Sequence, residues 1–235
     1  SGAQKFAAVQ ATGAQNVAAA AKAAGAKLTH VSAIGADPRS SSLYGRSKAE
    51  GERAVLEAVP EAVIMRPSIV FGPEDQFFNR FADMARYSPV LPMIGGGNTK
   101  FQPVFVGDVA EAIARSVDGI VKGGSVYELG GPNILTFREC LEQMLEIIDR
   151  KRILAPVPWL VAELQAAVLE LLPRPLLTRD QVTLLKSDNV VSREAEEGHR
   201  TLTGVGIEPK STAAVLPSYL WRYRAAGQFT QKSEA

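Results

Sequence analysis

Apolar side chains recur along this chain alternately at helical and at extended spacing, and the alternation predicts an α/β fold. Residues 3–24 carry apolar side chains three and four positions apart and end at Gly25, as an amphipathic helix does. Short apolar runs at residues 27–34 and 62–66 predict buried strands, with a helix between them at about residues 42–58. Strands that alternate with helices form parallel sheets.

The alternation continues to about residue 150. It predicts loops at 68–73 and 89–97, strands at 101–106 and 125–129, and helices at about 75–86, at 108–118 with an Asp108–Glu111 capping box, and from Thr136 with Glu139 in its first turn. After residue 151, prolines separate apolar helices at 159–172 and 178–185, and strand signals fade. We therefore expect a parallel α/β domain in residues 1–150 and a small, mostly helical lobe in residues 151–235.

The composition is that of an ordinary globular protein and narrows the function only a little. The chain has 235 residues, of which 46% are hydrophobic and 22% charged, and a formal net charge of +1. Such a balance gives no global field for nucleic acid, so we expect no nucleic-acid partner. The single cysteine, Cys140, lies on an amphipathic helix as core and fits a reducing, cytoplasmic compartment. No apolar run is long enough to span a membrane.

Polar residues on a helix face that should be apolar carry the candidate chemistry. Tyr44 and Lys48 lie four residues apart, one above the other on one face of the helix at 42–58. An ammonium beside a phenol favours the phenolate, so we expect Lys48 to lower the pKa of Tyr44. Ser32, at the end of the preceding strand, supplies a hydroxyl that can polarise a carbonyl. Together these groups suit proton transfer.

In chain order, these residues and the segments that follow them resemble the second half of an extended short-chain dehydrogenase/reductase. The segments are Arg66-Pro-Ser-Ile-Val-Phe-Gly-Pro73 and Gln102-Pro-Val-Phe-Val-Gly-Asp-Val-Ala110. The resemblance implies a Rossmann-like parallel sheet, with residues 1–150 as the second half of a dinucleotide-binding domain. It also implies that Tyr44 is the acid/base, that Lys48 binds the nicotinamide ribose, and that Ser32 orients a substrate. The loop of Pro67, Ser68 and Val70 would line the nicotinamide.

Further segments resemble an atypical branch of this family, which includes an accessory subunit of respiratory complex I and its bacterial relatives. They are Ser40-Ser-Ser42, Phe77-x-Asn-x-Phe81, Gln102-Pro-Val104 and Leu177-Thr-Arg-Asp180. This resemblance implies NADP or NAD held structurally, with Tyr44 and Lys48 on the ribose. It also implies a membrane-associated respiratory or quinone-related partner, and a cytoplasmic location that is peripheral on the inner face of the membrane.

An active enzyme of the epimerase/dehydratase or reductase type is the alternative, and a dinucleotide sensor is a third. An enzyme would transfer a hydride to a carbonyl of a nucleotide sugar, a flavonoid-like ketone or an isoprenoid or quinone precursor. Ser32 lies only 12 residues before Tyr44, which leaves little chain for a substrate-contacting wall and favours the structural role. The sequence therefore leaves catalysis undecided.

The glycine-rich βα turn that holds the pyrophosphate in this fold is absent from the sequence. Gly95-Gly-Gly97 and Gly204-x-Gly206 do not lie between a strand and a helix, so we interpret both as turns. We expect the natural protein to be longer by about the first hundred residues of the fold. The residue that selects NAD or NADP would lie there.

Three other features have simpler interpretations. His30 has no partner at metal-ligand spacing, so we expect a packed core histidine and no metal site. Asn79 and Arg80 either face a ligand or lie on a helix surface. The aromatic residues Trp159 and Trp221 lie in the helical lobe, where we expect them to pack on the sheet domain, with a membrane or protein partner as the alternative.

Overall fold

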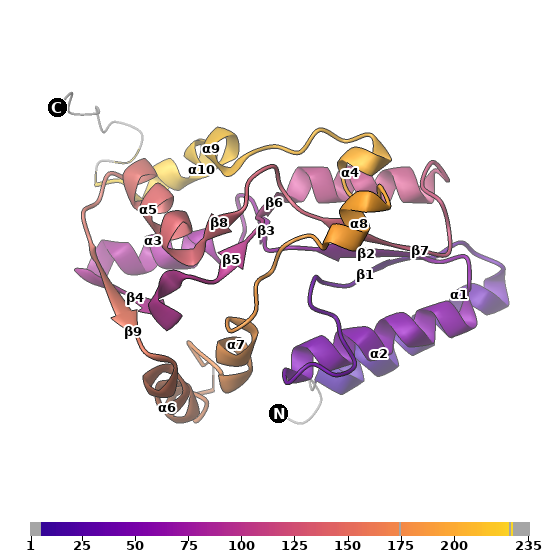
Figure 1. Cartoon of the computed structure of the whole chain (residues 1–235), viewed down its shortest axis with the longest axis horizontal. Coiled ribbons are helices and arrows are strands. Elements are labelled where there is room, and N and C mark those ends of the chain that lie inside the picture. The colour runs from indigo at the N-terminus through magenta and orange to yellow at the C-terminus, as the bar shows by residue number, and fades with distance from the viewer. Residues whose placement is uncertain (1–5, 174, 226, 228–235) are drawn as a thin grey trace. The chain divides into compact units, whose positions relative to one another are not determined.

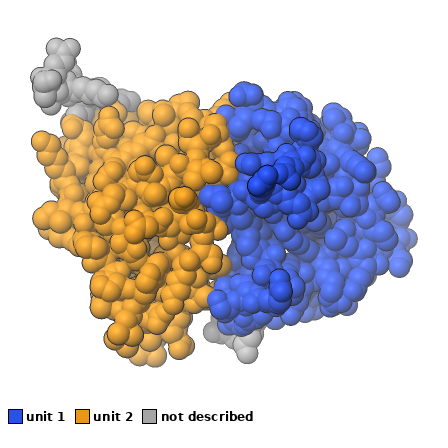
Figure 2. All heavy atoms as spheres, viewed as in Figure 1, with its two compact units in different colours: residues 1–68, 107–130, 189–209 blue, residues 69–106, 131–188, 210–235 orange. Residues whose placement is uncertain are grey.

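The structure is a computed structural model that describes residues 6–173, 175–225 and 227. The chain forms two compact units, and each unit combines three separate stretches of sequence (Figure 2). Unit 1 comprises residues 1–68, 107–130 and 189–209, and unit 2 comprises residues 69–106, 131–188 and 210–235. The sequence analysis instead divides the chain at a single point, into residues 1–150 and 151–235, and that division stays a prediction.

Unit 1 is built on the parallel sheet that the sequence pattern predicts. Its three strands, in the order β1–β2–β7, are β1 (Thr29–Val31), β2 (Val63–Pro67) and β7 (Ser125–Leu129). His30 is in register with Ile64 and Arg66 with Glu128, so these four side chains share one face of the sheet. All three strands lie where the apolar runs predict them, although β1 is shorter than the run at 27–34.

Helices cover both faces of this sheet (Figure 1). They are the π-helix η1 (Ala7–Thr12), α1 (Gly13–Ala24), α2 (Leu43–Ala58), α4 (Val106–Val117), α8 (Arg193–Glu197) and the 3₁₀ turn η3 (Thr203–Val205). The helices α1 and α2 lie side by side on one face, and α4 lies on the other. The start of α4 precedes Asp108, so this buried residue lies inside the helix and does not cap it, contrary to the prediction.

Small residues let α1 and α2 approach the sheet and each other. Ala14 and Ala18 of α1, Val55 of α2 and Ile64 of β2 form one apolar cluster. A Cβ on Gly51 would lie 2.5 Å from the carbonyl oxygen of Gln10, so only glycine allows this spacing. The packing fixes α2, and with it the face that carries Tyr44 and Lys48.

Among its described residues, unit 2 has three pairs of short strands. They are the parallel pairs β3 (Val70–Phe71) with β6 (Val104–Phe105) and β4 (Val90–Ile94) with β9 (Ile153–Val157), and the antiparallel pair β5 (Lys100–Phe101) with β8 (Leu135–Thr136). Three predictions are corrected here. The predicted loop at 68–73 contains β3, the predicted loop at 89–97 contains β4, and the predicted strand at 101–106 is divided between β5 and β6.

The helices of unit 2 surround an aromatic core. They are α3 (Phe78–Tyr87), the turn η2 (Gly95–Gly97), α5 (Phe137–Ile147), α6 (Trp159–Leu169), α7 (Arg179–Leu184), α9 (Thr212–Val215), α10 (Pro217–Leu220) and the turn η4 (Trp221–Tyr223). Thr136 and Glu139 form the predicted capping box of α5, and its predicted apolar face is buried. The helices predicted at 159–172 and 178–185 are α6 and α7, although β9 was missed. No helix in the described ranges is long and apolar enough to cross a bilayer.

Candidate functional site

Tyr44 and Lys48 lie in the first two turns of α2, and Lys48 reaches the carboxyl end of β1. Ser42 caps the helix, since its hydroxyl accepts a hydrogen bond from the Gly45 amide at 3.2 Å. A Cβ on Gly45 would lie 2.7 Å from Ser40 Oγ and 2.9 Å from the carbonyl oxygen of Gly35. Glycine at this position therefore lets the start of α2 lie against the loop that follows β1.

Lys48 reaches from α2 to the end of β1. Its Nζ donates a hydrogen bond of 3.2 Å to the carbonyl oxygen of Val31 and lies 5.8 Å from the centre of the Tyr44 ring. Partial burial lowers the pKa of Lys48, and the nearby Glu52 carboxylate opposes that shift. Lys48 therefore presents an ammonium group at the edge of the sheet.

Tyr44 is half-buried, and the effect on its phenol is opposite to the one predicted. Burial raises the pKa of Tyr44 above its ordinary value, because the phenolate loses hydration. The Phe6 ring contacts the Tyr44 ring edge-on at a centroid distance of 5.8 Å and contributes to that burial. Lys48 Nζ is too far from the phenol ring to outweigh the loss of water, so the prediction of a lowered pKa is wrong.

Ser32 and His30 lie on the sheet face that α2 covers. Ser32 is 3% exposed, and its backbone N–H donates to the carbonyl oxygen of Met65 at 2.7 Å, just beyond the end of β1. Within the described part of the chain, Ser32 Oγ and His30 Nε2 are buried without a hydrogen-bond partner. Burial and the Lys48 charge lower the pKa of His30, in keeping with a neutral, packed histidine.

The predicted nicotinamide loop is divided between the two units. Pro67 is buried at the end of β2, and its carbonyl oxygen accepts from the Ile34 amide at 3.0 Å. Ser68 is also buried, and its hydroxyl donates to Asn189, at 2.7 Å from Oδ1 and 2.8 Å from the backbone carbonyl oxygen. Val70 belongs to unit 2, where β3 pairs with β6. The structure therefore brings Ser32, Lys48 and Pro67 to one edge of the unit 1 sheet.

A buried ion network that the sequence analysis did not identify lies deeper on the same face. The Glu52 carboxylate accepts two hydrogen bonds from Arg66, at 2.8 Å from Nε and 2.6 Å from Nη2. Arg66 Nη1 lies 3.6 Å from Glu128 Oε1, and both carboxylates raise the pKa of Arg66. The signals were present, because Glu52 continues the four-residue spacing after Lys48 and Arg66 interrupts an apolar strand.

Other candidate residues do not contribute to this edge. Asn79 is buried within unit 2, where its amide donates to the carbonyl oxygens of Pro73 and Asp75. Cys140 is fully buried in the unit 2 core, which raises the pKa of its thiol to about 12. Among the residues that the structure describes, no three His, Cys, Asp or Glu side chains are placed to hold a metal ion.

Comparison with known proteins identifies the family. The sequence model of the RmlD substrate binding domain matches residues 34–176, which is more than half of the chain. The chain is 36% identical over 211 residues to the mitochondrial NADH dehydrogenase [ubiquinone] 1 alpha subcomplex subunit 9 of Arabidopsis thaliana, covering 86% of this chain and 52% of that protein. It is also 44% identical over 82 residues to a ceramide reductase of Caulobacter vibrioides, covering 35% of this chain and 26% of the reductase.

The fold is also that of solved dehydratases. The dTDP-glucose 4,6-dehydratase of Bacillus anthracis, solved in complex with NAD, superposes with a TM-score of 0.68 at 18% identity, covering 93% of this chain and 68% of that one. The chain spans about half the length of the Arabidopsis relative. It belongs to the RmlD substrate binding domain family and has the Rossmann-like α/β fold that the sequence motifs predict.

Proposed function

From this family membership and the edge formed by Ser32, Lys48 and Pro67, we propose that the chain forms the nicotinamide-binding half of a dinucleotide-binding protein. NADP or NAD is held structurally, with Tyr44 and Lys48 on the nicotinamide ribose. Pro67, Ser68 and Val70 line the nicotinamide ring. The similarity to a named subunit of NADH dehydrogenase supports a respiratory partner.

The observation that carries the proposal is unused hydrogen-bonding capacity at the carboxyl edge of the sheet. Ligands in open parallel sheets bind outside the carboxyl ends of the strands, and this edge holds both Lys48 and Ser32. An ammonium has three donors, of which Val31 takes one, and the buried hydroxyl of Ser32 has no partner within the described residues. Both groups fit a ribose and its neighbouring carboxamide.

The raised pKa of Tyr44 is compatible with a structural role for the cofactor and argues against Tyr44 as a general base. A phenol that keeps its proton is a poor general base at neutral pH, but it remains a good hydrogen-bond donor to a ribose hydroxyl. When bound, the nicotinamide supplies a centre that can give or accept a hydride. This chain supplies the positive charge of Lys48, which lies beside the buried Ser32 at the carboxyl edge of the unit 1 sheet.

A reductase is the second candidate, and the similarity to a ceramide reductase favours it. In that case Ser32 Oγ holds the oxygen of a substrate carbonyl, and Tyr44 Oη donates a proton to the same oxygen as it is reduced. A raised pKa suits this acid role, because the phenol is protonated when the substrate arrives. Lys48 then stabilises the negative charge left on Tyr44.

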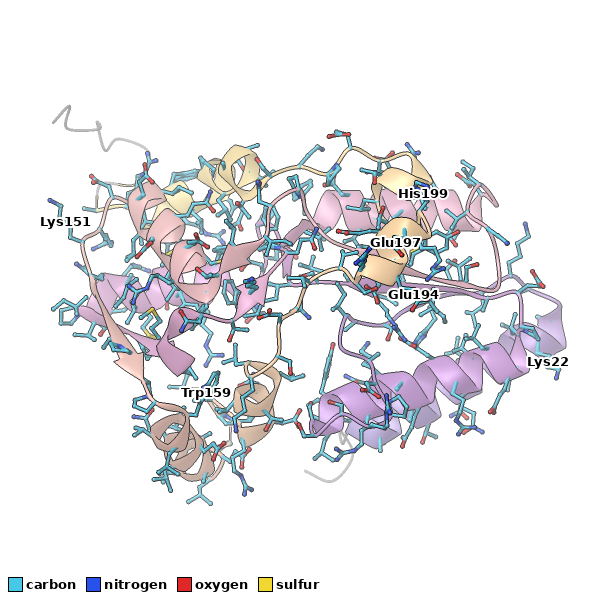
Figure 3. The ribbon with its side chains drawn as sticks, in the orientation of Figure 1. Lys22, Lys151, Trp159, Glu194, Glu197 and His199 are labelled. Carbon is cyan, nitrogen blue, oxygen red and sulfur yellow. The ribbon has the colours of Figure 1, made fainter. Side chains whose placement is uncertain are left out.

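Calorimetric titration of the natural full-length protein with NADPH and NADH tests the proposal. We expect Lys48→Met to weaken binding about tenfold or more, because the site loses a charged donor. Lys22→Met is the matched control, since Lys22 is exposed on α1 (Figure 3), and it should bind like the wild type. Equal binding by the two variants would contradict the assignment of Lys48.

Tyr44→Phe separates the two functions. If the cofactor is structural, this variant binds the dinucleotide slightly less well and no carbonyl substrate is turned over by either protein. If the protein is a reductase, wild-type turnover of a carbonyl panel falls by about 100-fold or more in Tyr44→Phe. The panel includes a nucleotide sugar, a flavonoid-like ketone, a quinone precursor and a long-chain ketone.

We also propose that the protein is peripheral on the inner face of the membrane and that α6 and the residues after it face the lipid. This stretch is unusually apolar at its surface, with Leu164 62% exposed and Leu171 84% exposed. Its carboxylates are neutralised, because Glu163 pairs with Lys186 and Glu170 pairs with Arg179. Such a short apolar surface suits insertion into the headgroup region.

Flotation with vesicles of phosphatidylethanolamine and phosphatidylglycerol tests this placement. We expect Leu164→Glu to abolish co-flotation of the full-length protein. Ile120→Glu, at an apolar residue of unit 1 that is 68% exposed, serves as the control and should leave flotation unchanged. Flotation of Leu164→Glu at the wild-type level would refute the lipid contact and leave dinucleotide binding to its own test.

A further inference from the structure

Residues 189–209 return to unit 1 after the chain has passed through unit 2, and they pack along the outer strand of its sheet. The Glu128 amide of β7 donates to the carbonyl oxygen of Arg200 at 2.9 Å. In turn, Glu128 Oε2 accepts from the Ser192 amide at 2.7 Å. This returning segment is therefore held to the sheet at two points, and Asn189 is its first residue.

Asn189 connects two loops that are far apart in the sequence. Its side-chain Oδ1 and its backbone carbonyl oxygen lie 2.7 Å and 2.8 Å from Ser68 Oγ, which donates its single proton to one or the other. Its Nδ2 donates to the carbonyl oxygen of Ile34 at 3.2 Å. One amide side chain thus contacts the loop after β1 through its nitrogen and the loop after β2 through its oxygen.

The two loops connected in this way carry the candidate site residues. Ile34 follows Ser32 by two residues, and Ser68 follows Pro67 directly. The loops also contact each other, because the Ile34 amide donates to the carbonyl oxygen of Pro67 at 3.0 Å. Asn189 therefore braces a direct loop-to-loop hydrogen bond from the side of the returning segment.

Only a side chain with both a donor and an acceptor at this length can make these contacts. An aspartate keeps an acceptor for Ser68 but has no donor for the Ile34 carbonyl oxygen, and a leucine has neither. Apolar contacts hold the same region in place, since Ile34 packs with Val191 and Ala195 of the returning segment. Apolar packing is not directional, so the hydrogen bonds of the Asn189 amide fix the position of the returning segment relative to the two loops.

We infer that Asn189 is a positioning residue that sets the spacing between the Ser32–Ile34 loop and the Pro67–Ser68 loop, and so fixes the nicotinamide end of the site. Asn189 acts through Ser68 and Ile34. The inference rests on the proposed function for its effect on dinucleotide binding. Its effect on the loops is independent of any ligand, and the two effects are measured separately.

The test uses the natural full-length protein and two readouts, the Kd for NADPH and the rate of amide hydrogen exchange at Ile34. Asn189→Leu should raise the Kd about tenfold, and Asn189→Asp should raise it by a smaller factor, because one of the two contacts remains. In Asn189→Leu without ligand, the Ile34 amide should exchange about tenfold faster.

Ser192→Ala is the matched control on the same returning segment. It removes the hydroxyl that caps α8, which accepts from the Ala195 amide at 3.2 Å, and keeps the backbone N–H that Glu128 uses. We expect a lowered melting temperature for this variant but a Kd within about twofold of wild type. If Asn189 had a purely structural role, Asn189→Leu and Ser192→Ala would show the same change in Kd for the same loss of melting temperature.

The Ser68→Ala variant adds an internal check. Asn189→Leu removes the Oδ1 acceptor of the Ser68 hydroxyl and keeps the backbone carbonyl oxygen, so the change in Kd for the double variant should be smaller than the sum of the changes for the two single variants. Additive effects would overturn the inference, as would a Kd for Asn189→Asp and Asn189→Leu within about twofold of wild type.

The inference can still be tested if Asn189→Leu does not fold or if the wild type binds no dinucleotide. If Asn189→Leu does not fold, the milder Asn189→Asp carries the comparison with Ser192→Ala. If the wild type binds no dinucleotide, the proposed function fails. In that case unchanged exchange at Ile34 would overturn the positioning role as well, and faster exchange would support it.

Discussion

Removing the charge of Glu52 should destabilise the protein far more than removing an exposed charge on the same helix. The Glu52 side chain is 7% exposed and accepts two short hydrogen bonds from Arg66, whose side chain is 24% exposed. In Glu52→Gln, the amide oxygen can still accept one hydrogen bond from Arg66, but the nearest carboxylate is then that of Glu128, at 3.6 Å. The guanidinium would then be largely buried with its charge only partly compensated.

The magnitude follows from the burial of the pair. Breaking a fully buried ion pair by removing one partner costs about 3–5 kcal/mol of unfolding free energy. Because Arg66 retains some solvent and the Glu128 carboxylate, we expect about 2–3 kcal/mol for Glu52→Gln. In a chain of this size that corresponds to a loss of roughly 4–12 °C in melting temperature.

Urea denaturation and thermal unfolding measure the loss. The control is Glu57→Gln, because Glu57 also pairs with an arginine on α2, Arg53, at 2.6 Å, but both side chains are mostly exposed. We expect less than about 0.5 kcal/mol for this control. The double variant Glu52→Met/Arg66→Met should cost less than the sum of its single variants, since no unpaired guanidinium remains. A loss for Glu52→Gln no larger than for the control would refute the reasoning.

Three further predictions concern other parts of the structure. Burial lowers the pKa of His30 below its ordinary value of about 6.5. Between the lowered pKa of the folded state and the ordinary pKa of the unfolded state, the unfolded state binds more protons, so the free energy of unfolding falls as the pH falls through this range. In urea unfolding from about pH 5 to 7, His30→Gln should make the free energy of unfolding depend less on pH. Gly51→Ala should cost about 1–3 kcal/mol in urea unfolding, because its Cβ meets the Gln10 carbonyl oxygen, whereas Gly13→Ala, with only an ordinary contact, should be neutral or stabilising; equal effects would contradict the close helix packing. Cys140, with a pKa of about 12, should react with an aromatic disulfide reagent at about pH 8 only on unfolding, and rapid reaction of the native protein would contradict its burial.

The sequence predicted the elements that depend on contacts between residues close together in the chain. The helix expected at about residues 42–58 is α2 at 43–58, and Thr136 and Glu139 form the expected capping box. These elements depend on side-chain periodicity and on contacts three or four residues apart, which the sequence displays directly. The same holds for the Tyr44–Lys48 pair, whose proximity follows from helical spacing alone.

The missed elements depend on partners far away in the chain. The strand β4, predicted as a loop, pairs with β9 more than 60 residues later, and both were missed. Pro92 lies within β4, where proline is tolerated because the strand lacks a neighbour on one side. Asn189 gave no local signal at all, because its contacts with Ile34 and Ser68 arise only when the returning segment folds back.

The direction of the Tyr44 pKa shift could not be predicted from residue types, because it depends on the balance between attraction to the Lys48 ammonium and loss of hydration of the phenolate. Spacing along the helix predicts that the Lys48 ammonium is near, and a near charge favours the phenolate. The structure places Nζ 5.8 Å from the ring centre, on the Val31 carbonyl oxygen, while Phe6 covers the ring. Loss of hydration therefore exceeds the attraction, and no sequence pattern reports either quantity.

The polar layer between α2 and the sheet changes in character from its inner to its outer end. At the inner end, Glu52 and Arg66 satisfy each other, and replacing such a pair with apolar residues would leave stability unchanged or improve it. At the outer end, within the described residues, Ser32 is buried without a partner and Lys48 uses one donor. A layer kept only for stability would not leave its outer end unsatisfied, since unpaired buried groups cost free energy. A ligand site needs groups with free hydrogen-bonding capacity that are held in place by a rigid support. The outer end supplies such groups, and the Glu52–Arg66 ion pair supplies the support.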